Sequence, residues 1–208
     1  MKKIGLLGGT FNPIHKAHIQ LAKAALKEFK LDKILIIPCG LPPHKTEQGI
    51  PYPEHRYQMA LLATQGIKKF DVSRIEVDRK GRSFAVDTCN LIQKEYPKAT
   101  IYYIMGLDAI NDILSWRKPL ELFKICEFIV ATRPGVAERQ FRRIMRFPIL
   151  KNYENKIHML QFNNKISSTE IRRRLSHGKS VSSMLPQPVL KYIKEHKLYP
   201  VPKESPSS

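Results

Sequence analysis

Two histidines, His15 and His18, follow a glycine pair, Gly8 and Gly9, near the start of the chain. An apolar run over residues 4–7 comes directly before the glycines, so the segment predicts a buried strand, a tight turn and a helix start. Glycine lets backbone N–H groups approach an anion, and a helix N-terminus carries a positive partial charge. Histidine adds N–H donors for phosphoryl oxygens. The spacing therefore predicts a phosphate-binding site at this turn.

The turn departs from the two commonest nucleotide-binding motifs. A Walker loop needs Gly-x-x-x-x-Gly-Lys followed by Ser or Thr, and a dinucleotide-binding turn needs Gly-x-Gly-x-x-Gly. Neither spacing occurs in residues 8–18, which read Gly-Gly-Thr-Phe-Asn-Pro-Ile-His-Lys-Ala-His. This segment resembles the Gly-Gly-Thr-Phe-Asp-Pro-x-His-x-Gly-His signature of the nucleotidyltransferase superfamily, and specifically of bacterial nicotinate mononucleotide adenylyltransferases.

Two positions differ from that signature. Asn12 stands where the family has Asp, which keeps an acceptor oxygen and the capacity to cap a helix but loses a charge. Ala17 replaces a Gly and adds only a methyl group at a position that is expected to be helical. Neither change removes the paired histidines, so the phosphate-binding role that the resemblance implies is expected to persist.

A second segment, Ile-Ser-Ser-Thr-Glu-Ile-Arg, lies near the other end of the chain. Ser167 and Glu170 have the spacing of a capping box, which places Ser168 and Thr169 in the first helical turn and Arg172 on the next. Hydroxyls and free N–H groups in a first turn can meet an anion. Taken alone, the pattern favours a capped surface helix. It also resembles the Ile-Ser-Ser-Thr-x-Ile-Arg motif with which the same family closes over the ATP phosphates, and the presence of both motifs favours that interpretation.

Three shorter segments occur in family order between the two motifs. A Pro-Pro-His-Lys segment ends at Lys45 and resembles a family loop that brings a cation to the phosphates. Gly106 and Asp108 resemble a Gly-x-Asp at the adenosine side, and Arg133 opens an Arg-Pro-Gly like the loop near the adenine. Taken singly, a turn or a helix cap explains each segment. Their shared order favours the family.

The resemblance also implies where the second substrate is recognised. Relatives of the nicotinate-specific type hold the pyridine ring with a Ser-Tyr-Thr-x-Asp-Thr segment and a Trp, and backbone amides bind its carboxylate. Here residues 83–88 read Ser-Phe-Ala-Val-Asp-Thr, so Phe84 keeps an aromatic ring and Ala85 lacks the usual hydroxyl. A backbone N–H survives that change. Trp116 is the only tryptophan of the chain, and a place in the core is the other interpretation of it.

The resemblance therefore implies three groups of site residues. The expected catalytic donors are His15, His18, Lys45 and Arg172. The expected ATP-binding residues are Gly8, Gly9, Thr10, Phe11, Gly106, Asp108, Arg133, Ser168 and Thr169. The expected mononucleotide-binding residues are Asn12, His44, Ser83, Phe84, Ala85 and Trp116. No side chain is expected to ligate a metal, because phosphate oxygens and water are expected to hold Mg²⁺.

These motifs require a fold that brings strand ends together. Alternating strands and helices predict an α/β fold with a doubly wound, Rossmann-like parallel sheet, whose ligands bind at the carboxyl ends of the strands, and a small C-terminal helical portion. The expected strands are residues 4–7, 33–37, 74–77, 101–105, 128–131 and 157–162. The expected helices are residues 16–30, 54–65, 85–95, 169–176 and 189–196, with short helices within 108–124. Residues 141–155 are expected to be irregular, and the Pro- and Ser-rich residues 200–208 to be a disordered tail.

Composition bounds the class of protein. A chain of 208 residues with 42% hydrophobic and 26% charged residues can bury one full core, so residues 1–199 are expected to form a single nucleotidyltransferase domain. No apolar stretch approaches the length of a bilayer span, so no membrane association is expected. Three distant cysteines without a C-x-x-C pair indicate free thiols and a cytoplasmic location. Nothing fixes an oligomeric state, so a homo-oligomer stays open.

The charge is the main competing signal. Lys and Arg number 36 against 18 Asp and Glu, a net charge of +18 that would suit a nucleic-acid-binding protein. The densest basic groups, in residues 139–146 and 172–174, lie in no recognisable nucleic-acid motif. Substrates with several phosphates also favour a positive potential. The expected partners are therefore ATP and nicotinate mononucleotide, with no specific nucleic acid.

The activity that the resemblance implies is adenylyl transfer in NAD biosynthesis. The phosphate of nicotinate mononucleotide would attack the α-phosphorus of ATP in line, giving nicotinate adenine dinucleotide and pyrophosphate without a protein nucleophile. Catalysis would then rest on positioning and charge stabilisation. The nearer alternative is a related enzyme that uses nicotinamide mononucleotide or phosphopantetheine, although Trp116 with residues 83–88 argues against phosphopantetheine. A basic nucleic-acid-binding protein is the more distant alternative.

Overall fold

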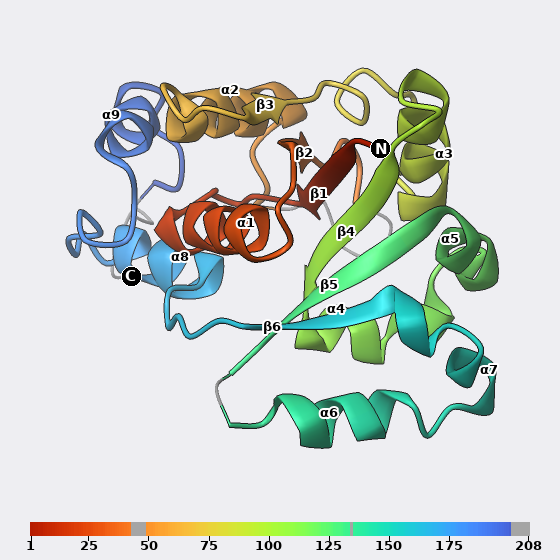
Figure 1. Ribbon diagram of the computed structural model, residues 1–208. Helices are drawn as coiled ribbons and strands as arrows, with labels where there is room; N and C mark the ends of the chain where they lie inside the picture. The colour runs from red at the N-terminus through yellow and green to blue at the C-terminus, as the bar shows by residue number, and fades with distance from the viewer. Residues whose placement is uncertain (43–48, 134, 201–208) are drawn as a thin grey trace.

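The computed structural model describes residues 1–42, 49–133 and 135–200, and Figure 1 shows a central sheet with helices on both sides. Six strands form this sheet in the order β3-β2-β1-β4-β5-β6, and every neighbouring pair is parallel. The order confirms the predicted doubly wound sheet, because the winding reverses between β1 and β4. The strands are β1 Lys3–Gly9, β2 Lys33–Pro38, β3 Phe70–Val72, β4 Thr100–Gly106, β5 Cys126–Thr132 and β6 Ile157–Gln161.

Helices connect successive strands, and α8 and α9 follow the last strand. The predicted helices over residues 16–30, 54–65, 85–95, 169–176 and 189–196 are confirmed, with ends within two residues of the observed ones. The longer helices are α1 Lys16–Glu28, α2 Pro53–Thr64, α3 Ala85–Glu95, α6 Ala137–Ile144, α8 Ser168–Ser176 and α9 Gln187–Glu195. The shorter ones are α4 Leu107–Asn111, η1 Ile113–Ser115, α5 Pro119–Ile125, α7 Pro148–Lys151 and η2 Glu154–Lys156. None of the helices in the described residues is long and apolar enough to cross a membrane.

The core has one layer on each face of the sheet. In β2, Ile34 and Ile36 pack in the layer beneath α1, α2, α8 and α9, whereas Leu35 and Ile37 pack in the layer beneath α3, α4 and α5. All four side chains are buried. A strand covered on both faces reads as a continuous apolar run, which is why the sequence revealed β2 so clearly.

The predicted strand at residues 74–77 is wrong. The strand that pairs with β2 is β3, and the chain turns directly after it, where Asp78 N–H donates to Arg74 O at 2.9 Å. Arg74 faces solvent and forms ion pairs with Glu54 at 3.0 Å and with Asp78 at 2.9 Å. Ile75 and Val77 alternate with polar residues as in a strand, which explains the wrong prediction. They lie in a turn in which Arg74 forms ion pairs with Glu54 and Asp78.

The prediction that residues 141–155 are irregular is also wrong. They contain the end of α6, all of α7 and the short helix η2. Ile144 and Leu150 are each only 1% exposed and anchor these helices in the core layer of α3 and α5. Two buried side chains in a basic segment are too few to produce a clear helical periodicity. Residues 201–208, most of the predicted tail, lie outside the described residues.

Candidate functional site

The first strand-to-helix turn, residues 8–15, is called the phosphate turn below. β1 ends at Gly9, Phe11 has a positive φ of 48° and is buried, and α1 begins at Lys16. A Cβ on Gly8 would meet the hydroxyl of Tyr103 at 2.9 Å. Glycine at this position therefore lets β4 approach the turn closely.

The two histidines of the motif form a stacked pair. Their ring centroids are 3.6 Å apart with an interplanar angle of 20°, and the edge of Phe11 packs on His18 at 5.0 Å. The backbone N–H of His15 donates to His18 Nδ1 at 3.2 Å. Because Nδ1 of His18 accepts, its proton is on Nε2, which leaves that N–H as a donor.

Burial keeps both imidazoles neutral at pH 7. It lowers the pKa of His15 to about 4, and it lowers the pKa of His18 well below 6.5, with a further decrease from the neighbouring His15. Two acceptor-capable atoms of the phosphate turn, His15 Nδ1 and Asn12 Oδ1, are buried and have no hydrogen-bond partner among the described residues. Buried polar atoms are normally paired, so these two indicate a position for a ligand or water.

The two sequence motifs meet in space, although 155 residues separate Pro13 from Ser168. Arg172 Nη1 donates to Asn12 O at 2.8 Å, and Ser168 Oγ donates to Pro13 O at 3.0 Å. Thr169 stands exposed at the start of α8, and its Oγ1 lies 3.4 Å from Arg172 Nη2. The structure thus brings the N-terminal and C-terminal motifs into one site.

Only half of the predicted capping box forms. Ser167 Oγ accepts from the backbone N–H of Glu170 at 3.2 Å, as predicted. The Glu170 carboxylate pairs instead with Arg173 at 2.7 Å and with Arg174 at 2.8 Å. Two guanidinium partners hold this carboxylate more strongly than one backbone N–H would, and they lower its pKa to about 2.

The expected adenosine-binding residues lie at the ends of β4 and β5, across the point where the winding of the sheet reverses. Gly106 is the N-cap of α4, Asp108 lies in the first turn of that helix, and Arg133 directly follows β5. All three are exposed. They lie at the same carboxyl edge of the sheet as the phosphate turn, but no hydrogen bond in the described residues joins their side chains to it. His44 and Lys45 lie outside the described residues.

The segment of residues 83–88, called the mononucleotide turn below, leads into α3. Ser83 is 5% exposed, its N–H donates to Leu41 O at 2.9 Å, and its Oγ accepts from Gly40 N–H at 3.1 Å. Phe84 is the N-cap of α3 and Ala85 its first residue. The Ser83 hydroxyl therefore serves the loop after β2, which leaves backbone N–H groups as the donors of this turn.

Trp116 lies half-buried after η1 and packs against Tyr103, whose hydroxyl lies beside the first glycine of the phosphate turn. The two rings pack edge to face, with centroids 6.0 Å apart and an interplanar angle of 78°. Beside them, the guanidinium of Arg117 lies 4.7 Å from the Phe84 ring centroid and pairs with Asp87 at 3.6 Å. Trp116 thus joins the expected site through a ring contact and is not a fully buried core residue.

Sequence reasoning missed two buried charged residues beside these turns, Arg56 and Glu76, which are 1% and 7% exposed. Thr88 Oγ1 donates to Glu76 Oε1 at 2.6 Å, and burial raises the pKa of this carboxyl group. Both lie in segments that the sequence pattern assigned to secondary structure alone. Nothing in their sequence neighbourhood separates them from exposed helix and strand charges.

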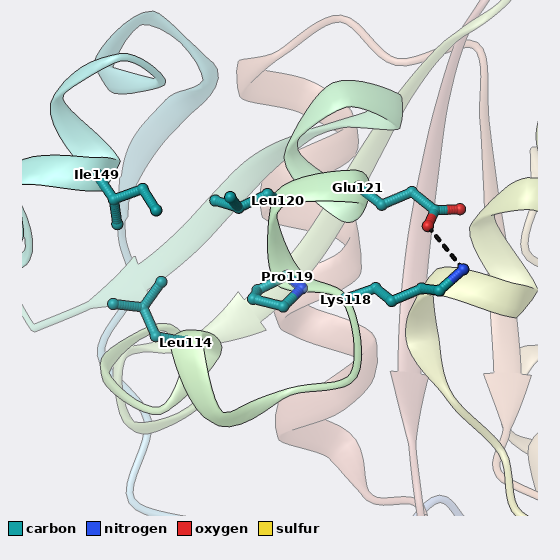
Figure 2. A pocket seen from close by; sticks show the side chains of 6 residues that line it. All are labelled: Leu114, Lys118, Pro119, Leu120, Glu121 and Ile149. Atoms are coloured by element: carbon teal, nitrogen blue, oxygen red, sulfur yellow. Dashed lines mark ion pairs between the residues drawn. The ribbon is translucent and has the colours of Figure 1, made fainter.

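A hollow of about 550 Å³ lies away from these turns (Figure 2). None of the expected site residues lines it, and its two charged side chains, Lys118 and Glu121, point toward one another as an ion pair at 3.0 Å. Their mutual pairing leaves no free charge there to recognise a phosphate. The remaining lining residues are Leu114, Pro119, Leu120 and Ile149.

Comparison with known proteins places this geometry in a family. The family model described as Cytidylyltransferase-like matches residues 6–174. Two curated relatives named "Probable nicotinate-nucleotide adenylyltransferase" are each 41% identical over 95% of this chain: one from Thermoanaerobacter sp. (strain X514), of which 94% is covered, and one from Moorella thermoacetica, of which 91% is covered.

Solved structures show the same fold. The structure titled "Plasmodium falciparum nicotinic acid mononucleotide adenylyltransferase complexed with NaAD" has a TM-score of 0.78 and 22% identity, covering 97% of this chain and 99% of that one. The complex of the Plasmodium falciparum protein with APC has a TM-score of 0.74 and 21% identity. The matched length and the 41% identity to the bacterial relatives show that the chain belongs to the cytidylyltransferase-like family, within its nicotinate-nucleotide adenylyltransferases.

Proposed function

We propose that this protein transfers the adenylyl group of ATP to nicotinate mononucleotide, giving nicotinate adenine dinucleotide and pyrophosphate. The observation that carries the proposal is the contact between the two motifs, in which Arg172 binds Asn12 O and Ser168 binds Pro13 O beside the stacked histidines. That contact gathers N–H donors and a fixed cation around one turn. The names of the bacterial relatives support the identity of the substrates.

The reaction needs positioned donors and no protein nucleophile. An oxygen of the mononucleotide phosphate attacks the α-phosphorus in line, a new P–O bond forms, and the bond to the pyrophosphate oxygen breaks. His18 donates from Nε2, and Arg172 supplies a permanent positive charge as charge shifts to the leaving pyrophosphate. A neutral imidazole keeps one N–H group, so His18 can donate from Nε2 at neutral pH although burial lowers its pKa. Lys45 is proposed as a further cation.

For ATP binding we propose the phosphate turn, the start of α8 and the ends of β4 and β5. A turn at a helix N-terminus offers N–H groups and a positive partial charge to phosphates. The exposed ends of the two strands would receive the adenosine. The proposed residues are Gly8, Gly9, Thr10, Phe11, Gly106, Asp108, Arg133, Ser168 and Thr169.

For the mononucleotide we propose recognition by backbone donors and by an aromatic face. The first turn of α3 has N–H groups without intrahelical acceptors, which suit a carboxylate. Trp116 offers a face on which a pyridine ring can stack. The proposed residues are Asn12, His44, Ser83, Phe84, Ala85 and Trp116, with Ser83 acting through the loop that it holds.

We propose that the reaction uses Mg²⁺ as a divalent cation. The described residues contain no group of three His, Cys, Asp or Glu side chains that could hold a metal. Triphosphate oxygens and water would therefore be its ligands, as is usual for Mg²⁺ on nucleotides. When bound, the cation neutralises phosphate charge, and the neutral histidine pair does not repel it.

We also propose that residues 1–199 act as one nucleotidyltransferase domain in the cytoplasm. Hydrogen bonds between α8 and the phosphate turn support the single domain, because neither motif is complete without the other. The three cysteines are free and buried, which supports a reducing compartment.

The test measures pyrophosphate release and the dinucleotide product. Purified protein is incubated with ATP, Mg²⁺ and a panel of acceptors, namely nicotinate mononucleotide, nicotinamide mononucleotide and phosphopantetheine. We expect the highest kcat/KM with nicotinate mononucleotide and a product with the mass of nicotinate adenine dinucleotide. Absence of product from every pyridine mononucleotide would refute the proposed function.

A further inference from the structure

Arg56 on α2 is the largest of the fully buried side chains, with 1% of its surface exposed. Within the part of the chain that the structure describes, its guanidinium donates only to backbone carbonyls. Nε binds Pro51 O at 3.0 Å, Nη1 binds Thr10 O at 2.9 Å and also Cys39 O, and Nη2 binds Gly40 O at 2.7 Å. The Arg56 side chain therefore connects the phosphate turn, the loop that follows β2 and the segment around Pro51 that precedes α2.

The same carbonyls lead on to the mononucleotide turn. The backbone N–H of Gly40 donates to Ser83 Oγ, and Ser83 N–H donates back to Leu41 O. A Cβ on Gly40 would lie 2.1 Å from Glu76 O, so the backbones approach too closely for any other residue. Arg56 thus stands at the centre of a buried hydrogen-bond chain that begins at Thr10 and ends at Ser83.

The partners of Arg56 are unusual for a buried charge. Among the described residues it forms no ion pair with a carboxylate, and its hydrogen bonds go to backbone carbonyls. Burial lowers the pKa of Arg56, and the nearby Glu76 opposes that decrease only in part. A buried cation of this kind is a costly way to stabilise a fold. Its planar fork, however, fixes several carbonyls in one plane at once, which the point charge of a lysine cannot do.

We propose that Arg56 is a positioning residue that holds the phosphate turn and the mononucleotide turn in register, so that the two bound phosphates meet in line. This inference rests on the proposed function. In-line attack depends on the relative placement of two substrates that bind separate turns, and a displacement of about 1 Å can cost roughly a hundredfold in rate. Loss of the Arg56 hydrogen bonds should therefore lower kcat and leave the affinity of each turn for its own substrate nearly unchanged.

The main test compares Arg56→Lys, which keeps the charge and loses the fork, with Arg56→Met, which loses both. We expect kcat to fall at least tenfold in both variants, on the scale of a small misplacement. KM for ATP and KM for nicotinate mononucleotide should each change less than about threefold. Arg74→Lys is the matched control, because Arg74 is exposed and pairs with carboxylates near the start of α2. It should retain wild-type kinetics.

A milder variant keeps the test decisive if the arginine variants do not fold. Ser83→Ala removes the acceptor for Gly40 N–H at the far end of the chain and leaves Arg56 in place. We expect kcat to fall about threefold to tenfold with KM for ATP unchanged. Thermal unfolding of each variant shows whether the protein is folded at the assay temperature.

Three results would overturn the inference. Wild-type kcat in a folded Arg56→Lys variant would assign the role to charge and not to position. A raised KM for one substrate with unchanged kcat would make Arg56 part of a single binding turn. Wild-type kcat in Ser83→Ala would break the chain that the inference requires. A wild-type protein that forms no dinucleotide refutes the proposed function instead, so the two failures are distinguishable.

Discussion

The phosphate turn and the mononucleotide turn use their polar side chains in opposite ways. In the phosphate turn, His15 Nδ1 and Asn12 Oδ1 are buried without a partner among the described residues. In the mononucleotide turn, Ser83 Oγ already accepts from Gly40, and Thr88 Oγ1 already donates to Glu76. The phosphate turn therefore leaves polar side-chain atoms without partners among the described residues. In the mononucleotide turn the polar side chains hydrogen-bond within the protein, which leaves backbone N–H groups and the Phe84 ring for a ligand.

From this difference we expect the two turns to contribute differently to catalysis and to specificity. Side-chain donors around reacting phosphates change the transition state, because charge shifts there during the reaction. Backbone donors at a helix start and a stacking ring select a substrate by shape and by hydrogen-bond pattern. We therefore expect side-chain variants in the phosphate turn to lower kcat, and variants near α3 to change the ratio between acceptors.

The largest expected effect concerns His18. We expect His18→Ala to fold normally and to lose at least about a hundredfold in kcat, because it removes a donor from the transition state. Pyrophosphate release under saturating ATP and mononucleotide measures this loss. The effect would assign a catalytic role to His18 in the first turn of α1, beside the phosphate turn.

His177→Ala is the control for that change. His177 is exposed at the C-cap of α8, and its ring contacts the helix end and not the phosphate turn. Its turnover should equal that of the wild type. A His18→Ala protein with kcat within a few-fold of the wild type would contradict the catalytic assignment.

The second prediction uses pH to test His15 of the phosphate turn. Burial lowers the pKa of His15 to about 4, whereas an unfolded histidine titrates near 6.5, so between these values the unfolded state binds more protons. The stability from the neutral His15 is therefore complete above about pH 6.5 and decreases as the pH falls toward 4. At pH 5 the loss should be about 2 kcal/mol of the free energy of unfolding.

Urea unfolding at pH 7 and pH 5 measures this loss. A His15→Gln variant is the matched control, because an amide keeps polar atoms at the site and does not titrate. The variant should lose about 2 kcal/mol less than the wild type between the two pH values. An identical loss in both proteins would show that His15 is not the group responsible.

The same contrast explains what the sequence revealed. The residues of the two motifs stand at fixed spacings in the sequence, so the resemblance predicted that the motifs meet, and Ser168 and Arg172 do bond to the phosphate turn. Five of the six parallel strands were also predictable, because apolar runs covered on both faces mark central strands.

The remainder could not be predicted for physical reasons. Arg56 donates to carbonyls of three segments, two of which are distant in the sequence, and a sequence pattern carries no record of such contacts. The wrong strand at residues 74–77 has a related cause. Ion pairs of Arg74 stabilise a turn there, and the apolar periodicity of the sequence contains no information about ion pairs. Residues 141–155 were missed because Ile144 and Leu150 are their only fully buried side chains, which leaves the apolar periodicity weak.

The third prediction removes a backbone donor from the mononucleotide turn. Ala85 is the first residue of α3, and Phe84 before it is extended, with φ −110° and ψ 135°. Proline fits that position, because the first helical N–H has no intrahelical acceptor and the preceding residue is already extended. We expect Ala85→Pro to fold and to lower the preference for nicotinate over nicotinamide mononucleotide about tenfold in kcat/KM.

Trp116→Ala is the comparison variant for that measurement. A stacking face accepts the acid and the amide ring equally, so kcat/KM should fall for both substrates and their ratio should stay constant. If Ala85→Pro left the ratio unchanged as well, the carboxylate donors would lie outside the first turn of α3.

The smallest expected effect is that of restoring the hydroxyl which relatives carry at position 85. Ala85→Thr adds one donor beside N–H groups that can already satisfy a carboxylate, so the gain in preference for nicotinate mononucleotide should stay below about threefold. Ala85→Val, which has the shape of threonine without its hydroxyl, separates the hydrogen bond from the added volume. Both variants should show the same stability, since position 85 is half-buried at a helix start. A tenfold gain in Ala85→Thr over Ala85→Val would mean that side chains recognise the carboxylate, and the contrast between the two turns would fail.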